Sequence, residues 1–274
     1  MNNEININSS RDELYRCLRK IVKNQLGKQD GFLLVEGKRQ IVSALKSGIK
    51  IKYLIYSQDK RGEDSLRAIS GQVRVGGNLI SMKPSLFEDL AETRSSQGVL
   101  LLSPMLEESL DLQSVFVQAT APILILENVQ DPGNTGTLIR TADAFGFAAV
   151  VITVGGCQPY NGKALRASMG ATFRIPLLTN VIVEDLLVEL SAQNYTLYAA
   201  DMDGQAIQKI DLAPSARTAL LLGNEGAGIS DLARQSSHLV SVPMLGDTES
   251  LNVAMAGTIL CWEIYRRRID SYKE

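Results

Sequence analysis

The stretch that most constrains the fold is residues 123–146, which read ILILENVQDPGNTGTLIRTADAFG. Its first four residues are apolar, and a short run of this kind is typical of a strand buried in a parallel sheet. Pro132 and Gly133 then interrupt the chain, and Asn134 lies where the N-cap of a helix is expected. The apolar residues that follow recur at helical spacing: Leu138, Ile139, Ala142 and Phe145. The stretch therefore predicts a strand, a polar loop and a helix.

This loop carries more polar residues than a turn requires. An ordinary β–α turn would explain the proline, the glycine and the cap, but not the crowding of Asn128, Asp131, Asn134 and Arg140. Open α/β sheets bind their ligands at the carboxyl ends of the strands, so we expect a functional site here. Neither the G-x-x-G of this loop nor the later Gly223–Gly228 segment, G-x-x-G-x-G, matches a nucleotide-binding fingerprint. These spacings argue against a standard Rossmann cofactor site.

Composition indicates the class of protein and its compartment. The chain has 274 residues, of which 45% are hydrophobic and 21% charged, as in globular proteins. We expect no secretory signal and no membrane span, because the polar N-terminus lacks an apolar core and no run approaches about 20 apolar residues. The three cysteines are isolated and His238 is the only histidine, which disfavours disulfides, a metal site and histidine triads. A cytoplasmic protein is expected.

Charge is divided unevenly between the two halves of the chain. Residues 1–104 hold 17 Lys and Arg against 11 Asp and Glu, whereas residues 105–274 hold 11 against 19. The asymmetry indicates two domains, of which the first would bind a polyanion. The alternative is that the basic residues of the first domain only face the solvent. We expect a small α/β domain at 1–104, a linker at 105–119 with one or two helical turns, and a second α/β domain at 120–274.

Strands and helices are expected to alternate in both halves. In the first half the pattern predicts helices at 10–26, 40–47, 66–69 and 84–91, and extended segments at 32–35, 52–56, 73–75, 79–81 and 99–102. In the second half it predicts strands at 123–126, 149–153, 196–200, 218–222 and 239–242, and helices at 135–145, 162–169, 183–193 and 252–269. The stripe of apolar residues on the last helix is typical of a core face or of an interface with a second subunit.

Three polar segments follow three strands of the second half and together resemble a known family. They are Asn128–Arg140, with Asn134 and Gly136, then Gly223-Asn224-Glu225-Gly226, then Ser250-Leu251-Asn252. Their order and spacing resemble the three motifs of the SpoU (TrmH) RNA ribose 2′-O-methyltransferases, a branch of the SPOUT superfamily. Ser168-Met169-Gly170-Ala171 is similar to a lesser element of that family. The first half, through segments such as Phe32–Arg39 (FLLVEGKR), resembles more loosely the L30e-like RNA-binding domain of some members.

The resemblance implies a fold and a set of site residues. It implies a C-terminal α/β trefoil-knot domain that binds S-adenosyl-L-methionine, preceded by the L30e-like domain. By the resemblance, cofactor-binding residues are Ala200, Gly223, Val242, Met244, Leu251 and Asn252. The corresponding catalytic residues are Arg140, Asn134, Glu225, Ser250 and Asn252. RNA-binding residues are expected among the cations of the first domain, namely Arg16, Arg19, Lys20, Lys23, Lys38 and Arg39.

The resemblance also implies a reaction, in which the methyl group goes to a ribose 2′-hydroxyl (EC 2.1.1.-). Two roles are open for Arg140: the base that takes the hydroxyl proton, or a cation that fixes a phosphate and stabilises an alkoxide. A guanidinium gives up its proton only far above neutral pH, so it is a poor base. Asn134 and Ser250 could be only helix caps. Ribosomal RNA is the expected substrate; transfer RNA, or an RNA-binding role without catalysis, is the alternative. The family resemblance and the last helix imply a homodimer through the C-terminal domain.

Overall fold

The computed structural model describes residues 4–23, 31–73, 78–104, 111–211, 217–246, 248 and 250–270. Its contacts divide the chain into two compact units. Unit 1 comprises residues 1–107 together with 160–173, and unit 2 comprises residues 108–159 and 174–274. Of the expected elements, the extended segment at 73–75 lies, except for Val73, outside the described residues, as does the side chain of Lys23.

Unit 1 is built on a mixed sheet with the strand order β1-β4-β3-β5-β2 over the described residues. The strands are β1 (Glu4–Ile7), β2 (Phe32–Glu36), β3 (Tyr53–Ser57), β4 (Asn78–Met82) and β5 (Val99–Pro104). β1, β4 and β3 are parallel, while β5 runs antiparallel to both β3 and β2. The central strands carry consecutive buried residues, as expected of a sheet covered on both faces.

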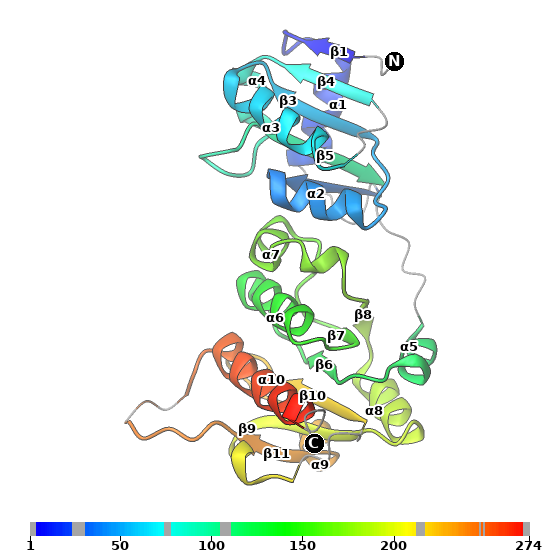
Figure 1. Ribbon diagram of the computed structural model, residues 1–274, viewed down its shortest axis with the longest axis vertical. Helices are drawn as coiled ribbons and strands as arrows, with labels where there is room; N and C mark the ends of the chain where they lie inside the picture. Colours follow the sequence, from blue (N-terminus) through cyan, green and yellow to red (C-terminus); the bar gives the residue numbers. More distant parts are fainter. Residues whose placement is uncertain are drawn as a thin grey trace. The chain divides into compact units, whose positions relative to one another are not determined.

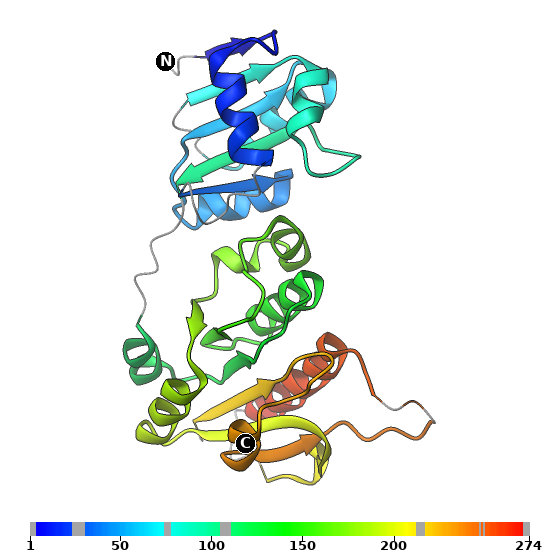
Figure 2. The same cartoon turned by 180° about the vertical axis from the view of Figure 1, so that it is seen from behind.

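Helices cover the two faces of this sheet and form two separate cores. On one face, α1 (Glu13–Lys23) and α4 (Pro84–Leu90) pack over Ile55, Ile80 and Leu100. On the other face, α2 (Lys38–Lys46) and α3 (Lys60–Ser70) pack over Leu54 and Leu101. α3 lies before the sheet in Figure 1, and α1 lies before it in the reverse view of Figure 2. The basic residues of α1 and those of α2 therefore lie on opposite sides of the unit 1 sheet.

Unit 1 also includes a segment that follows the first motif in the chain. It contains α7 (Gly162–Ser168) and the 3-10 turn η1 (Ala171–Phe173). Leu165 and Phe173 are buried in the core under α2, and Ser43 Oγ donates to the carbonyl oxygen of Gly170 over 3.0 Å. The Arg166 guanidinium is ion-paired with Glu92. Residues expected in the second domain thus pack with the first unit.

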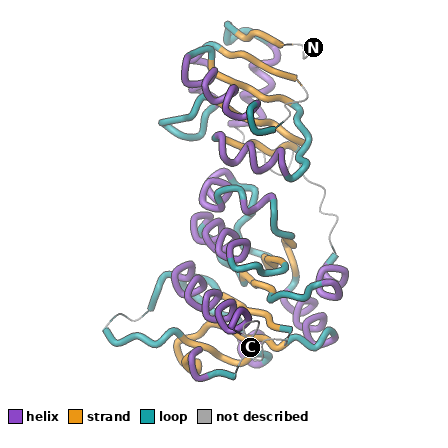
Figure 3. Tube along the Cα trace, in the orientation of Figure 1, coloured by secondary structure: helices purple, strands orange, loops and turns teal. Residues whose placement is uncertain are grey.

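Unit 2 is built on a parallel sheet with the strand order β11-β9-β10-β6-β7-β8 over the described residues. The strands are β6 (Ile123–Leu126), β7 (Ala149–Thr153), β8 (Leu177–Val181), β9 (Thr196–Ala206), β10 (Thr218–Leu222) and β11 (His238–Ser241). The three central strands are buried along their whole length. A parallel sheet needs helices on both faces, and Figure 3 shows them on either side of the strands.

The helices of unit 2 divide between the two faces. α5 (Leu112–Gln118), α8 (Val183–Ala192) and α9 (Asp231–Gln235) cover one core, and the 3-10 turn η2 (Ile207–Lys209) follows β9. α6 (Pro132–Ala144) and α10 (Val253–Asp270) pack against each other, α6 against β7 and α10 against β10. A Cβ atom on Gly257 would lie 2.4 Å from Leu222 and 2.6 Å from Leu138, so glycine permits this close approach. α5, expected in the linker, contributes the fully buried Phe116 to unit 2.

The structure corrects several expectations from the sequence. Asn134 is not the N-cap of α6: Asp131 is, and its carboxylate accepts from the backbone N–H of Asn134 over 2.9 Å. β1, β8 and α9 were not predicted, because they are short and only partly apolar. α3 begins at Lys60, six residues before the predicted helix, since Asp59 caps it and its buried face uses the small residues Gly62 and Ser65.

Candidate active site and adjoining cavity

The three motifs meet at one end of the unit 2 sheet. β6 and β10 are neighbours, with β7 and β8 on one side and β9 and β11 on the other. The chain therefore leaves β6 and β10 in opposite directions, which opens a crevice at their carboxyl ends. The loop after β6 carries the first motif, and the loop after β10 carries the second.

The loop after β10 is held in shape by its own backbone and by Asn224. The backbone groups of Asn224 and Gly228 exchange hydrogen bonds of 2.9 and 3.0 Å. Asn224 Oδ1 accepts from the N–H groups of Gly226 and Ala227, and its Nδ2 donates to the carbonyl oxygen of Asn128. A Cβ atom on Gly223 would lie 2.4 Å from the carbonyl group of Gly228, so only glycine fits where the loop closes on itself.

One hydrogen-bonded chain joins a residue from each motif. Asn134 Nδ2 donates to Glu225 Oε1 over 3.0 Å, and Asn252 Nδ2 donates to Asn134 Oδ1 over 3.1 Å. Glu225 also accepts from the backbone N–H groups of Gln130 and Asp131, each over 3.3 Å. These hydrogen bonds connect all three motifs. They therefore hold three loops that are far apart in the sequence next to one another.

The Glu225 carboxylate is kept ionised by its neighbours. Partial burial raises the pKa of this carboxyl group, but the hydrogen bonds donated by Asn134 and by the backbone of Gln130 and Asp131 outweigh burial, so the pKa is lowered. A carboxylate with a lowered pKa is a weak base. Glu225 therefore fits a connecting role better than proton transfer.

Asn252 and Ser250 lie at the start of α10 and differ in their bonding. Asn252 Oδ1 accepts from the N–H groups of Ala254 and Met255 over 2.9 and 3.3 Å, as an N-cap does. Asn252 thus fixes the start of the helix with its oxygen and reaches Asn134 with its nitrogen. Ser250, which could have been the cap, is exposed.

Arg140 lies on the exposed face of α6, whereas Leu138 and Ile139 are fully buried beside it in sequence. Its guanidinium makes no hydrogen bond or ion pair with any residue in the described part of the chain. A cation without such a partner keeps its donors available for an anionic ligand.

A cavity of about 880 Å³ adjoins this network in unit 2. All six residues predicted to bind the cofactor line it, together with Glu225 and Ser250. Apolar side chains such as Val253, Ala256 and Leu260 form another part of the wall. Small-molecule pockets commonly measure roughly 300–1,000 Å³, so the cavity has the size for a nucleoside cofactor.

The predicted RNA-binding residues are not brought together. Arg16, Arg19 and Lys20 are exposed on α1, and Arg19 Nε pairs with Asp89 over 2.6 Å. Lys38 and Arg39 begin α2, on the other face of the sheet. The six cations therefore do not form one surface, because the sheet separates the described members of the two groups.

The sequence reasoning missed Glu127, although it singled out the next residue, Asn128. The Glu127 carboxylate is buried and accepts from the N–H of Ser230 over 3.0 Å, which ties the end of β6 to the start of α9. Asn128 has a positive φ of 53°, a conformation that asparagine tolerates better than most residues. The signal available for Glu127 was its place directly after a buried strand. Within the described residues there is no cluster that could hold a metal ion and no helix long and apolar enough to cross a membrane.

A doubly wound parallel sheet with polar loops at its switch point, and a nucleoside-sized cavity beside them, defines an α/β enzyme domain. Comparison with known proteins narrows this class. Residues 121–262 match the model of the SpoU rRNA Methylase family, and residues 17–101 match an MRM3-like substrate binding domain. The chain belongs to the SpoU rRNA Methylase family.

Relatives and solved structures cover both units. The chain is 32% identical to the 23S rRNA (guanosine(2553)-2′-O)-methyltransferase RlmP of Bacillus subtilis, over 94% of this chain and 98% of the relative. It resembles the SpoU methyltransferase AviRb of Streptomyces viridochromogenes with a TM-score of 0.80 and 26% identity, covering 95% of this chain and 99% of that one. An AdoMet-bound rRNA methyltransferase of Sinorhizobium meliloti gives a TM-score of 0.82 and 27% identity, covering 96% and 98%.

Proposed function

We propose that the chain is an S-adenosylmethionine-dependent methyltransferase that modifies a ribose 2′-hydroxyl of ribosomal RNA in the cytoplasm. The observation that carries the proposal is the hydrogen-bonded chain from Asn252 through Asn134 to Glu225 beside the cavity. Ribosomal RNA is favoured over transfer RNA because relatives that span both units, such as those of Bacillus subtilis and Sinorhizobium meliloti, are named as rRNA enzymes. A role without catalysis is disfavoured, because Arg140 and the whole network are present.

The cavity fits this cofactor. Its wall combines apolar side chains for a base with backbone loops, closed at Gly223, that can approach a ligand directly. We propose that Ala200, Gly223, Val242, Met244, Leu251 and Asn252 bind the cofactor. When bound, S-adenosylmethionine supplies a methyl group on a positively charged sulfur. The residues of this chain have to orient the ribose oxygen toward that group and keep it there.

Arg140 is proposed to act as a cation, not as a base. A guanidinium has no acceptor atom, and its planar donors match the oxygens of a phosphate. From the exposed face of α6 it would hold the phosphate next to the target ribose and stabilise the negative charge that develops on the 2′-oxygen. Asn134, Glu225, Ser250 and Asn252 would form the polar wall that positions this helix and the cavity.

The test is the activity of Arg140 variants on RNA. Loss of such a stabilising group typically lowers a rate by roughly 100-fold or more, so Arg140→Ala should nearly abolish methylation. Arg140→Lys should recover little, because lysine keeps the charge but loses the planar fork. Methyl transfer from radiolabelled cofactor to rRNA measures the rate, and mapping of 2′-O-methyl sites in cells with and without the protein identifies the nucleotide.

The matched control is Arg67→Ala, which removes another exposed arginine from a helix and should leave the rate near wild type. Binding of the cofactor and the circular dichroism spectrum of Arg140→Ala should be unchanged, since the side chain is exposed. Near-normal methylation by Arg140→Ala would refute the assignment of Arg140.

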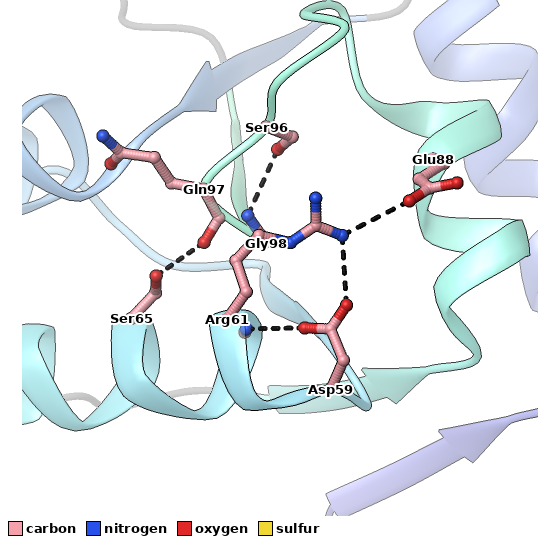
Figure 4. A network of polar contacts seen from close by, with 8 residues as sticks. Asp59, Arg61, Ser65, Glu88, Ser96, Gln97 and Gly98 are labelled. Atoms are coloured by element: carbon pink, nitrogen blue, oxygen red, sulfur yellow. Dashed lines mark hydrogen bonds and ion pairs between the residues drawn. The ribbon is translucent and has the colours of Figure 1, made fainter.

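We propose that unit 1 contacts RNA at the starts of α2 and α3, not along α1. The loop that precedes β5 is tied to both helices: the N–H of Lys38 donates to Gln97 Oε1 over 2.9 Å, and Ser65 Oγ donates to the Gln97 carbonyl. Figure 4 shows the bond between Ser65 and Gln97 and, next to it, Arg61 bridging Asp59 and Glu88. The Arg61 guanidinium is therefore paired with two carboxylates, one at the start of α3 and one on α4.

Three cations remain available at this end of the sheet. Lys38, Arg39 and Arg94 form no ion pair with any described residue, and Arg39 and Arg94 are exposed. The buried Glu36 carboxylate accepts from the N–H groups of Glu92 and Thr93, which holds the loop carrying Arg94 close to α2. Fixed cations at one edge suit a phosphate backbone. Residues 1–104 are proposed as the substrate-binding domain, 105–119 as the linker and 120–274 as the catalytic domain, although helix α5 of this linker packs into unit 2 and residues 160–173 pack with unit 1.

We also propose that the catalytic domain is a trefoil knot and forms a homodimer through α10. The proposed knot is supported by the return of α10 to the first motif, where Asn252 meets Asn134. The proposed dimer is supported by a row of exposed apolar residues along α10: Met255, Ile259 and Trp262. An exposed apolar row of this kind commonly marks a protein interface.

A further inference from the structure

One wall of the cavity is made by an irregularity in β9. β9 pairs with β11 at Ala199, and the pairing resumes only at Gln205, so residues 200–204 lie outside the ladder. A Cβ atom on Gly204 would lie 2.5 Å from the backbone nitrogen of Val240, which shows how closely the two strands approach where pairing resumes. Bulges often re-aim side chains beside functional sites. Here the bulge brings residues 200–203 to the cavity, among them the carboxylates of Asp201 and Asp203.

Asp201 is the more buried of the two carboxylates of this bulge. Its side chain is 12% exposed, its Oδ1 accepts from the N–H of Asp203 over 3.0 Å, and its Oδ2 is ion-paired with Arg234 of α9. Each carboxylate oxygen can accept two hydrogen bonds, so both oxygens keep one free position. Arg234 also lines the cavity. Neither residue belongs to the three sequence motifs.

We propose that Asp201 accepts hydrogen bonds from the ribose hydroxyls of the bound cofactor, and that Arg234 is a positioning residue for this carboxylate. The inference rests on the proposed function. A carboxylate is a good match for a cis-diol because its two oxygens accept from two neighbouring donors; dinucleotide-binding folds also place an acidic residue on ribose. The ammonium group of the cofactor fits less well, because the Arg234 cation already occupies one side of the carboxylate.

The test uses calorimetric titration of the full-length protein with S-adenosylhomocysteine and with its 2′,3′-dideoxy analogue. Asp201→Ala should bind S-adenosylhomocysteine roughly tenfold or more weakly than wild type, since hydrogen bonds to a charged group are lost. For the dideoxy analogue, wild type and Asp201→Ala should have the same affinity. Arg234→Ala should also weaken S-adenosylhomocysteine binding, and Arg234→Lys should restore much of it by keeping the charge.

Asp231→Ala is the matched control, because it removes the same charge from an exposed position on α9, the helix that carries Arg234, and Asp231 does not line the cavity. It should bind both ligands as wild type does. An equal loss for the two ligands in Asp201→Ala would overturn the inference, and so would unchanged affinity for S-adenosylhomocysteine. If wild type bound neither ligand, the proposed function itself would fail, a result distinct from failure at Asp201 alone.

Discussion

At the scale of single residues, the site depends on which groups donate and which accept. The Glu225 carboxylate receives three donors, from Asn134 Nδ2 and from the N–H groups of Gln130 and Asp131. Asn134 in turn uses its oxygen to accept from Asn252. The direction of every bond is therefore set by Glu225, which can only accept when ionised.

Replacing Glu225 with glutamine should disturb this order while keeping the shape. A glutamine has one accepting oxygen, whereas the carboxylate has two. Its amide nitrogen would take the place of the second oxygen and would face an N–H donor, with which it cannot form a hydrogen bond. We expect Glu225→Gln to lower the free energy of unfolding by about 1 kcal/mol, a modest value because the loop is solvent-exposed. The methylation rate should fall strongly, because Asn134 and Asn252 would lose the hydrogen bonds that fix their orientation. Thermal melts and rate measurements test the two effects separately.

The same carboxylate predicts a pH dependence. Because the pKa of Glu225 is lowered in the folded protein, its ionised form favours folding, and this contribution is present above the usual carboxyl pKa of about 4.3. It is lost as pH falls through the lower, folded-state pKa. The stability difference between wild type and Glu225→Gln should therefore shrink on acidification from neutral pH. A constant difference down to the acid transition would contradict the hydrogen-bonded assignment.

At the scale of elements, α10 connects the site with an exposed surface. Its first residues are capped by Asn252, its middle passes close to α6 at Gly257, and its outer face is apolar. Trp262 lies 5.7 Å from the rings of Phe145 and Tyr265, so the two helices share an aromatic cluster next to this face. A second subunit on the face would lie against both helices that carry the site.

The dimer proposal predicts the effect of a charge on this face. Ile259→Arg should convert a dimer into a monomer, because an arginine cannot be buried there without a partner. Sedimentation velocity at micromolar concentration measures the mass. Val188→Arg is the matched control, since Val188 is an exposed valine on α8 and its replacement should leave the dimer intact. A monomeric wild type would refute the proposed dimer.

At the scale of the whole molecule, the division of charge supports the proposal that the first unit binds RNA. Residues 1–104 carry a net positive charge and the remainder a net negative one. Removing residues 1–104 is a poor test of this proposal, because Leu165 and Phe173 would lose the core in which they are buried. Substitutions in the full chain leave that packing intact.

Paired substitutions can decide which face of unit 1 binds RNA. The double variant Arg39→Ala with Arg94→Ala should weaken RNA binding, and each lost phosphate contact should lower the salt slope by about 0.7 to 0.9. Arg16→Ala with Lys20→Ala removes the same charge from the other face and should leave the slope unchanged. Filter binding across a series of salt concentrations measures both. The opposite pattern would move the interface to α1.

The sequence by itself determined the elements whose signals are local. The apolar run at 123–126 and the helical spacing after it predicted β6 and α6, because both periods are set by neighbouring residues. The three motifs likewise indicated the family, and the cofactor residues taken from that resemblance all line one cavity. Strand-end loops can be recognised from sequence because the strands before them are almost entirely apolar.

Only the tertiary structure decided which of several similar residues does each task. Asp131 instead of Asn134 caps α6, and Asn252 instead of Ser250 caps α10, because the cap depends on backbone angles and on competing partners. The bulge that brings Asp201 to the cavity depends on the pairing of β9 with β11. In this pairing Ala199 lies opposite Leu239, forty residues later in the sequence. The basic residues of α1 and α2 were divided by the sheet between them. Each of these outcomes rests on contacts between distant segments, which no local pattern records.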